Sequence, residues 1–288
     1  MSHRTFQTVV KATALNMDGF RVVQPLPHSR LQHVDPFLLL HHAGPTTIEP
    51  GTPARWAGVP PHPHRGFEPV TFVFQGGVHH RDSRGNDSVI GPGGVQWMTA
   101  GMGIVHSERP PAELARQGGQ QELIQLWVNL PAAHKMVQPR YIGLEEAEIP
   151  VASLPSGKLQ VMAGRVNGVQ GPVPTFSPLT ASILHTEGSG RIELELPEGQ
   201  HGLVYVISGC LTQQDQTVEA HHLGRFGTSG LLALEAQGPA TALVLSGEPL
   251  NEPVVKSGPY VMNTQTQILE AMRDAQMGRM GILIEDFD

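Results

Sequence analysis

Two short pairs of potential metal ligands constrain this chain more than any other feature. The first is His62-Pro63-His64, and the second is His106-Ser107-Glu108. Alternate side chains of an extended strand point to the same face, so each pair can aim both of its groups inward. Two such strands facing each other inside a barrel would offer three imidazoles and one carboxylate to one metal ion. The spacing therefore predicts a metal site formed by His62, His64, His106 and Glu108.

Glycine and proline are spread along the sequence rather than gathered in one tract. They number 33 and 25 of the 288 residues, which is well above ordinary usage. Frequent turns between short strands indicate an all-β protein, and the length suffices for two ordinary domains. The clearest strand signals are Thr71–Phe74, Val95–Thr99 and Ile124–Leu130, the last of which alternates apolar and polar residues.

The second half of the chain repeats this texture weakly, as a duplicated barrel would. Leu203–Ser208 followed by Gly209 resembles the earlier strand that ends at Gly76. Proline-rich residues 131–155 are interpreted as the connection. We therefore expect two domains, 1–135 and 136–288.

A single helix is predicted near the C-terminus. Thr264 and Gln267 have the spacing of a capping box, and Gly278 is placed to end the helix. Ile268, Met272 and Ala275 fall on one face. The helix is expected to belong to the second domain.

Charge and cysteine content exclude several classes of partner and location. The net charge is −7, and lysine and arginine form no cluster, which disfavours direct binding to nucleic acid or to an anionic membrane surface. Neither a membrane-spanning apolar stretch nor a signal peptide is apparent in the sequence. Cys210 is the one cysteine, so a reducing, cytoplasmic location is expected.

A lone H-x-H motif is more often surface decoration than a metal site. Here Pro61 and Pro63 stiffen the backbone around the first pair, and a His/Glu pair follows at a distance that a β-meander can close. Glu68 comes shortly after and is a further candidate ligand or base. The doublets His41-His42, His79-His80 and His221-His222 are interpreted as solvated or turn histidines, because adjacent strand residues point to opposite faces.

Several longer motifs resemble the signature of the pirin family within the cupin superfamily. They are H-P-H-R-G-F-E at 62–68, H-R-D-S at 80–83, V-Q-W-M-T-A-G-M-G-I-V-H-S-E at 95–108 and I-Q-L-W-V-N-L-P at 124–131. D-P-F-L-L-L at 35–40 and G-P-Y-V-M-N-T at 258–264 extend the resemblance to nearly the full length. Such ordered matches are far more specific than one H-x-H.

The resemblance implies a bicupin, that is, two jelly-roll β-barrel domains with one mononuclear metal in the N-terminal barrel. The ligands would be His62, His64, His106 and Glu108. Iron is the usual metal, with Mn, Ni, Cu, Co or Zn as other divalent choices. Bacterial relatives are associated with quercetin 2,3-dioxygenase activity, which uses a flavonol and dioxygen. The animal member is associated with transcriptional co-regulation, so a metal-dependent regulatory protein with a protein partner is the alternative.

The chain departs from the family pattern at two places. His41-His42 follows D-P-F-L-L-L where acidic residues are common, and Gly94 stands where aspartate is frequent. The role of His41-His42 stays open. When the two halves of the sequence are aligned so that Gly209 matches Gly76, the second domain has no counterpart of either ligand pair. This domain is therefore predicted to bind no metal.

Two carboxylates are candidates for proton transfer in a flavonol dioxygenase. Glu108, or Glu68 close behind it, would accept the proton of a flavonol hydroxyl. Apolar walls are expected from Trp97, Met98, Met102, Phe72 and Phe74, although ordinary core packing is the alternative for most of them. Arg65 is a candidate anchor for the loop. A purely structural zinc site is the remaining alternative, and it would have no open coordination position.

Overall fold

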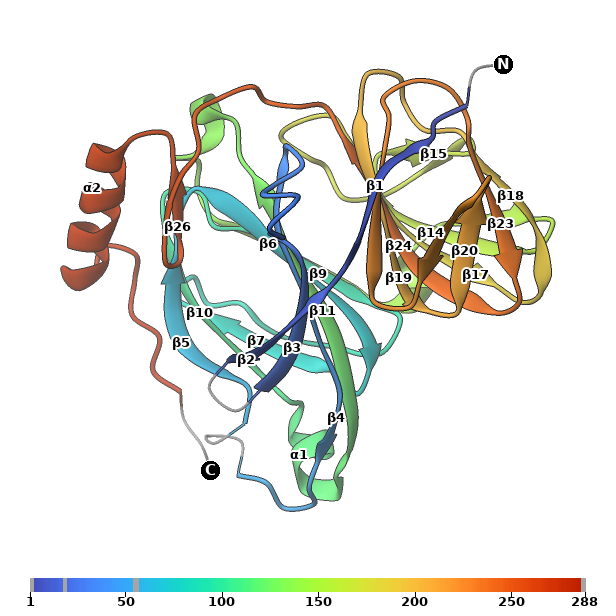
Figure 1. Ribbon diagram of the computed structural model, residues 1–288. Helices are drawn as coiled ribbons and strands as arrows, with labels where there is room; N and C mark the ends of the chain where they lie inside the picture. The colour runs from blue at the N-terminus through green and yellow to red at the C-terminus, as the bar shows by residue number, and fades with distance from the viewer. Residues whose placement is uncertain (1–2, 18–19, 54–56, 286–288) are drawn as a thin grey trace. The chain divides into compact units, whose positions relative to one another are not determined.

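The computed structural model describes residues 3–17, 20–53 and 57–285. Strands dominate this part of the chain, so the prediction of an all-β protein with a C-terminal helix is confirmed (Figure 1). The helical elements in it are α1 (Ala112–Gln117), α2 (Gln265–Gln276) and the short turns η2 (Ala132–His134) and η3 (Glu146–Glu148). The chain divides into two compact units, which are described separately.

One unit, called here the site unit, comprises Asn16–Val22, His41–Glu146 and Asn251–Asp288. Its smaller sheet has the order β5 (Val59–His64), β10 (Ile104–Arg109), β7 (Val78–Asp82) and β8 (Asp87–Ile90). A larger sheet has the order β12 (Arg140–Leu144), β9 (Val95–Thr99), β6 (Phe67–Gln75), β11 (Gly119–Asn129), β4 (Phe37–Ile48), β3 (Phe20–Leu26) and β2 (Thr13–Met17). Of the last three strands, only residues 41–48, 20–22 and 16–17 belong to this unit.

Strand register in the smaller sheet brings the two predicted ligand pairs together. His106 of β10 lies opposite His62 of β5, and Ile104 lies opposite His64. The register shifts after His106, as at a β-bulge, and bulges re-aim side chains next to functional sites. On the other side of β10, His106 pairs with Asp82 of β7.

The C-terminal helix belongs to the site unit and not to the second domain of the expected division. Thr264 and Gln267 form the predicted capping box at the start of α2. Its buried face, Ile268 and Ala271, packs in one cluster with Tyr260 of the hairpin formed by β25 (Val255–Ser257) and β26 (Tyr260–Met262). The apolar contact with this hairpin therefore determines the unit to which the helix belongs.

The companion unit comprises Met1–Leu15, Val23–Leu40 and Ala147–Leu250. One sheet has the order β1 (Phe6–Lys11), β22 (His222–Phe226), β19 (His201–Ser208), β24 (Ala240–Gly247), β17 (Leu179–Thr186), β14 (Gly157–Ala163) and β13 (Val151–Leu154). A second sheet has the order β18 (Ser189–Leu194), β23 (Leu232–Gln237), β20 (Cys210–Gln213) and β21 (Gln216–Glu219). A two-stranded sheet is formed by β15 (Arg165–Val166) and β16 (Val169–Gln170).

The N-terminal strand also departs from the expected division, because it lies in the companion unit. Phe6 of β1 pairs with Phe226 of β22. Next to it, the buried guanidinium of Arg4 donates to five backbone carbonyls, which are those of Leu196, Pro197, Gln200, Gly227 and Gly230. Hydrogen bonds from a charged donor are stronger than neutral ones, so these contacts hold the N-terminal strand on this unit. The units are thus interleaved in sequence, whereas the expected ranges 1–135 and 136–288 are consecutive.

Among the residues that the structure describes, no helix is long and apolar enough to cross a membrane.

Candidate metal centre

Three histidines from two neighbouring strands form one compact group. The Nε2 atom of His62 lies 3.0 Å from the Nε2 atoms of both His64 and His106. One nitrogen from each ring can be chosen so that all three lie within 4.8 Å of one another. His64 and His106 are 3% and 1% exposed, whereas His62 is half-buried. Such a convergence of imidazoles suits a divalent transition metal.

Hydrogen bonds at the opposite ring atoms fix how His62 and His64 present these nitrogens. Nδ1 of His62 donates to the carbonyl of Pro60 at 2.8 Å, and Nδ1 of His64 donates to the carbonyl of Pro259 at 3.3 Å. A carbonyl can only accept, so Nδ1 carries the proton in both rings. In the neutral rings, the two Nε2 atoms therefore face each other with lone pairs and no shared proton. A bound cation relieves that repulsion, so the residues present fit a metal ion.

His80 and Asp82 orient the third imidazole. Nε2 of His80 donates to Oδ2 of Asp82 at 3.0 Å, which leaves Nδ1 of His80 to accept from Nδ1 of His106 at 3.4 Å. The His80 ring also stacks on Tyr141, with 4.3 Å between the centroids. Burial opposes ionisation of Asp82, but hydrogen bonds from His80 and Asn86 outweigh it and keep the pKa of the carboxyl below its ordinary value. Such partners of metal-binding histidines commonly fix the tautomer and raise ligand basicity.

Both buried imidazoles are neutral at physiological pH. Burial is the main cause that lowers the pKa of His64 and His106 well below the ordinary value of 6.5, and the neighbouring His62 lowers both further. Metal binding requires the unprotonated ring nitrogen. The electrostatics of the group therefore favour the form of histidine that binds metal.

Glu108 lies two residues after His106 on β10, but its carboxylate is not part of the compact histidine group. Instead, Oε1 accepts from Thr71 Oγ1 at 2.9 Å and from the amide of Gln96, and Oε2 accepts from Gln125 Nε2 at 2.9 Å. The indole of Trp127 donates to the carbonyl oxygen of Gln125, which fixes the orientation of that amide. Glu108 is thus a carboxylate with a prearranged set of donors.

Glu68 does not lie beside Glu108, contrary to the sequence interpretation. Glu108 contacts Thr71 on one face of the larger sheet. Glu68 points away from the other face, because Glu68 and Thr71 are an odd number of residues apart on β6. Thr71 bonds to Glu108, whereas Glu68 is 1% exposed and accepts from Thr99 Oγ1 at 2.6 Å. Its other ionic neighbour is Arg140, with 3.6 Å between the nearest charged atoms. Glu68 therefore lies apart from the donors that hold Glu108.

The buried Glu68 carboxyl is expected to make the stability of the protein depend on pH. Burial raises its pKa to about 7 from 4.5, against the opposing effects of Thr99 and Arg140. The folded state then binds the proton more tightly than the unfolded state, so this contribution is complete below pH 4.5 and is lost as the pH rises through 7. Its size is at most about 3 to 4 kcal/mol, at about 1.4 kcal/mol per pKa unit.

Urea unfolding of the wild type and of Glu68→Gln between pH 4.5 and 8 measures this contribution. The free energy of unfolding should fall with rising pH more steeply in the wild type than in the variant. Glu113→Gln, at an exposed position of α1, is the control and should follow the wild type. Parallel profiles for the wild type and Glu68→Gln would contradict the prediction.

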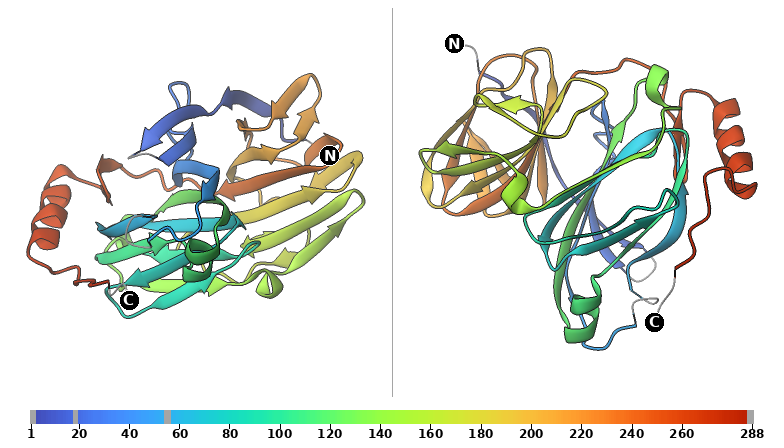
Figure 2. Two further views of the ribbon diagram at one scale, coloured as in Figure 1. Left: turned by 90° about the horizontal axis from the view of Figure 1, so that it is seen from below. Right: turned by 180° about the vertical axis from the view of Figure 1, so that it is seen from behind.

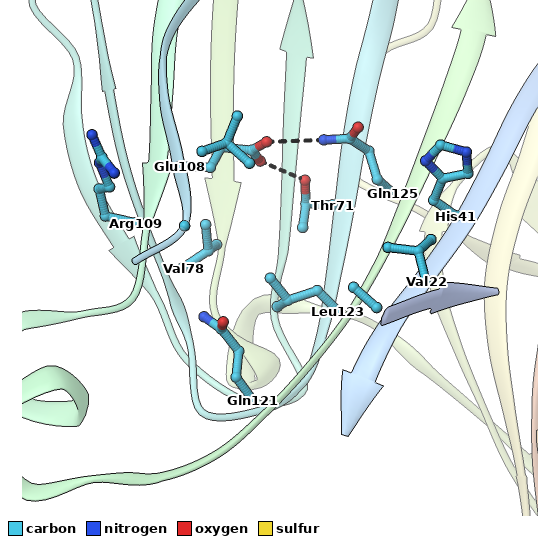
Figure 3. Close-up of a pocket in the computed structure, with 12 residues that line it drawn as sticks. Val22, His41, Thr71, Val78, Glu108, Arg109, Gln121, Leu123 and Gln125 are labelled. Atoms are coloured by element: carbon cyan, nitrogen blue, oxygen red, sulfur yellow. Dashed lines mark hydrogen bonds between the residues drawn. The ribbon is translucent and has the colours of Figure 1, made fainter. Parts of the chain in front are cut away.

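A cavity of about 180 Å³ lies beside Glu108 in the site unit (Figure 3). Its apolar lining comes from Val22, Ala43, Val59, Val78 and Leu123, and its polar lining comes from His41, Thr71, Glu108, Arg109, Gln121 and Gln125. The three clustered histidines are not among its lining residues. The residues expected from the sequence to form apolar walls also do not line it; these are Trp97, Met98, Met102, Phe72 and Phe74. Trp97, Met98 and Phe72 are instead core residues, at most 1% exposed.

The histidine doublets are not all solvated, which corrects their interpretation from the sequence. His80 and His42 are 0% and 1% exposed, and His42 bonds to Glu122 at 3.0 Å. His41 lines the cavity, where burial, helped by the charge of Lys256, lowers its pKa to about 4. The sequence signal for His80 was available, since His80 and Asp82 have the same alternate spacing as the two ligand pairs.

Comparison with known proteins matches both halves of the chain. The pirin domain matches residues 19–128, and the pirin C-terminal cupin domain matches residues 183–281. A Pseudomonas aeruginosa protein named "putative quercetin 2,3-dioxygenase" is 44% identical over 266 residues, which cover 91% of this chain and 92% of that protein. Pirin of Homo sapiens is 34% identical over 270 residues, which cover 91% of this chain and 89% of that protein.

A solved structure agrees with these matches. The crystal structure of quercetin 2,3-dioxygenase from Acinetobacter baumannii superimposes with a TM-score of 0.92 at 37% sequence identity, covering 98% of this chain and 100% of that one. These findings agree with one another. The chain has two cupin-type domains and a histidine cluster, and its relatives match it over nearly their whole length. The chain belongs to the pirin family of the cupin superfamily.

Proposed function

We propose that this protein is an iron-dependent dioxygenase that opens the ring of flavonols such as quercetin. The observation that carries the proposal is the convergence of the three Nε2 lone pairs of His62, His64 and His106, which fits a divalent metal. A partly apolar cavity lined by Glu108 lies in the same unit. The names of the Pseudomonas aeruginosa and Acinetobacter baumannii relatives support the substrate class.

His62, His64, His106 and Glu108 are the proposed ligands. A carboxylate offers about four lone-pair sites, and Glu108 uses three of them for Thr71, Gln96 and Gln125. One site is therefore left for a metal. Three nitrogens and one oxygen resemble the mixed sets of non-haem iron sites, which keep positions open for substrate and dioxygen. When bound, the metal would supply Lewis acidity and redox chemistry.

The protein side chains bind the substrate and move its proton. Three donors hold the Glu108 carboxylate in place, and the one lone-pair site that they leave serves either the metal or, when Glu108 acts as the base, the proton of the flavonol hydroxyl. His41 is neutral at pH 7, so its ring can donate or accept a hydrogen bond at the far polar end of a flat aromatic ligand (Figure 3). Val59, Val78 and Leu123 provide the apolar contact.

Loss of quercetin absorbance tests this proposal. Protein stripped of metal and reloaded with Fe²⁺ is incubated with quercetin in air and under argon. We expect oxygen-dependent loss of the flavonol absorbance with the loaded protein, because the reaction needs both metal and dioxygen. The metal-free protein and free Fe²⁺ are the controls, and both should leave most of the flavonol intact.

Absence of metal- and oxygen-dependent loss in a protein with one bound iron would contradict the dioxygenase proposal. It would favour the alternative, a regulatory protein whose bound metal controls a protein partner. A structural zinc site would behave differently again, because removal of the metal would then unfold the protein.

A further inference from the structure

Each ligand pair is followed directly by an arginine whose guanidinium is buried. Arg65 follows His64, and Arg109 follows Glu108. Their side chains are 5% and 9% exposed. Each meets a carboxylate of the chain beyond residue 250, called here the C-terminal segment (Asn251–Glu285). In Figures 1 and 2 this segment, drawn in red, runs beside β5 of the site unit.

Arg65 connects one end of the two ligand strands to α2. Its Nη1 donates to Oδ2 of Asp274 at 3.1 Å, and its Nε donates to the carbonyl of Met102 at 2.7 Å. Met102 lies in the turn that leads into β10. A single guanidinium therefore links the end of β5, the start of β10 and the helix.

Arg109 makes the equivalent connection at the other end of the same strands. Its Nε and Nη2 donate to the two carboxylate oxygens of Glu285 at 3.1 and 2.7 Å, the paired geometry that holds an arginine most firmly. Nη1 donates to the carbonyl of Ala57, just before β5, at 2.8 Å. Both ends of the β5–β10 pair are thus tied to the C-terminal segment.

The hairpin of the C-terminal segment also contacts a candidate ligand directly. The carbonyl of Pro259 accepts from His64 Nδ1, and Val261 N donates to the carbonyl of Arg65 at 3.0 Å. A Cβ atom at Gly66, where φ is +86°, would lie 2.0 Å from the carbonyl oxygen of Val261. The hairpin therefore approaches the ligand corner as closely as a glycine allows.

We propose that the C-terminal segment is a brace that positions the metal ligands, with Asp274 and Glu285 as positioning residues that act through Arg65 and Arg109. The brace fixes the spacing of His62, His64, His106 and Glu108 before metal binds. Its loss lowers metal affinity although neither carboxylate touches the metal. The inference rests on the proposed metal centre and is independent of the reaction that the centre performs.

Co²⁺ binding to the full chain tests the brace. Affinity is measured by competition with a chelator, and the Co²⁺ absorption bands report coordination geometry. The double variant Asp274→Asn/Glu285→Gln should bind Co²⁺ about 10- to 100-fold more weakly, the range typical of residues that support metal ligands. Its Co²⁺ bands should also differ from those of the wild type, because the ligand spacing is altered.

Two variants and one stability measurement separate positioning from general loss of structure. Glu270→Gln removes one negative charge from an exposed position of the same helix and should bind Co²⁺ like the wild type. Asp274→Glu restores the carboxylate and should recover most of the affinity that Asp274→Asn loses. All proteins are compared well below the unfolding temperature of their metal-free forms, as judged by circular dichroism.

A folded double variant with wild-type Co²⁺ affinity and spectrum would overturn the brace. A wild type that binds no Co²⁺ would overturn the brace together with the metal centre. Failure to cleave quercetin would count against the proposed dioxygenase alone, since Co²⁺ binding is measured without substrate.

Discussion

Replacing His106 with alanine is expected to remove most of the bound metal. His106 is the only clustered histidine on β10, and its Nδ1 bonds to the His80–Asp82 pair that orients it. Loss of a supporting residue typically costs 10- to 100-fold in metal affinity, so loss of a ligand should cost more than about 100-fold. Metal content after purification and Co²⁺ affinity by competition both measure this effect.

His222→Ala is the matched control for His106→Ala. His222 lies on β22 of the companion unit, where its Nδ1 donates to the carbonyl of Ala220. The control should retain its metal. Equal metal retention in the two folded variants would refute the assignment of the site.

The second large effect is expected at Glu108, whose removal should lower the rate of flavonol loss by about 10²- to 10⁴-fold. That is the usual contribution of a positioned general base. Glu108→Ala takes away both the proposed proton acceptor and the proposed fourth ligand, and it removes one acceptor each from Thr71, Gln96 and Gln125. Steady-state rates and metal content of the same preparation are measured together.

Glu68→Gln is the sharpest control for Glu108→Ala, since both residues are buried carboxyls of the site unit. Glu68 contacts Thr99 on the opposite face of the sheet, so its replacement should leave the rate within a few fold of the wild type. A fall in rate with Glu68→Gln equal to that with Glu108→Ala would contradict the division of roles. Full metal retention in Glu108→Ala, with a reduced rate, would leave Glu108 as a base and not as a ligand.

Local sequence pattern predicted those parts of the site that depend on strand parity. His62 and His64 share a face because they are two residues apart, and the structure places both with His106 in one group. The same rule, applied to His80 and Asp82, would have identified the pair that orients His106. The same rule does not place Glu68, because no sequence feature states which face of β6 points toward the ligands.

The lining of the cavity and the unit to which each terminal element belongs could not be predicted from strand parity. His41 reaches the cavity because β4 joins the larger sheet beside β11, an arrangement that depends on strands distant in sequence. The C-terminal helix packs on its own hairpin in the site unit, and the N-terminal strand pairs with β22 in the companion unit. A boundary drawn along the chain assumes that neighbours in sequence share a domain, and both termini break that assumption.

The sequence by itself determined the all-β class, the capped C-terminal helix, the family and the ligand pairs that carry the metal proposal. The all-β class follows from the distribution of turn residues, and the family from the resemblance of its ordered motifs. The helix and the ligand pairs follow from residue spacing within a segment, since strand alternation and helix capping are set by the local backbone. Only the tertiary structure decided that Asp274 and Glu285 hold the arginines beside the ligands, that Glu68 faces away from Glu108, and that the histidine tautomers direct three lone pairs to one point. Those facts depend on hydrogen bonds between segments brought together only when the sheets close.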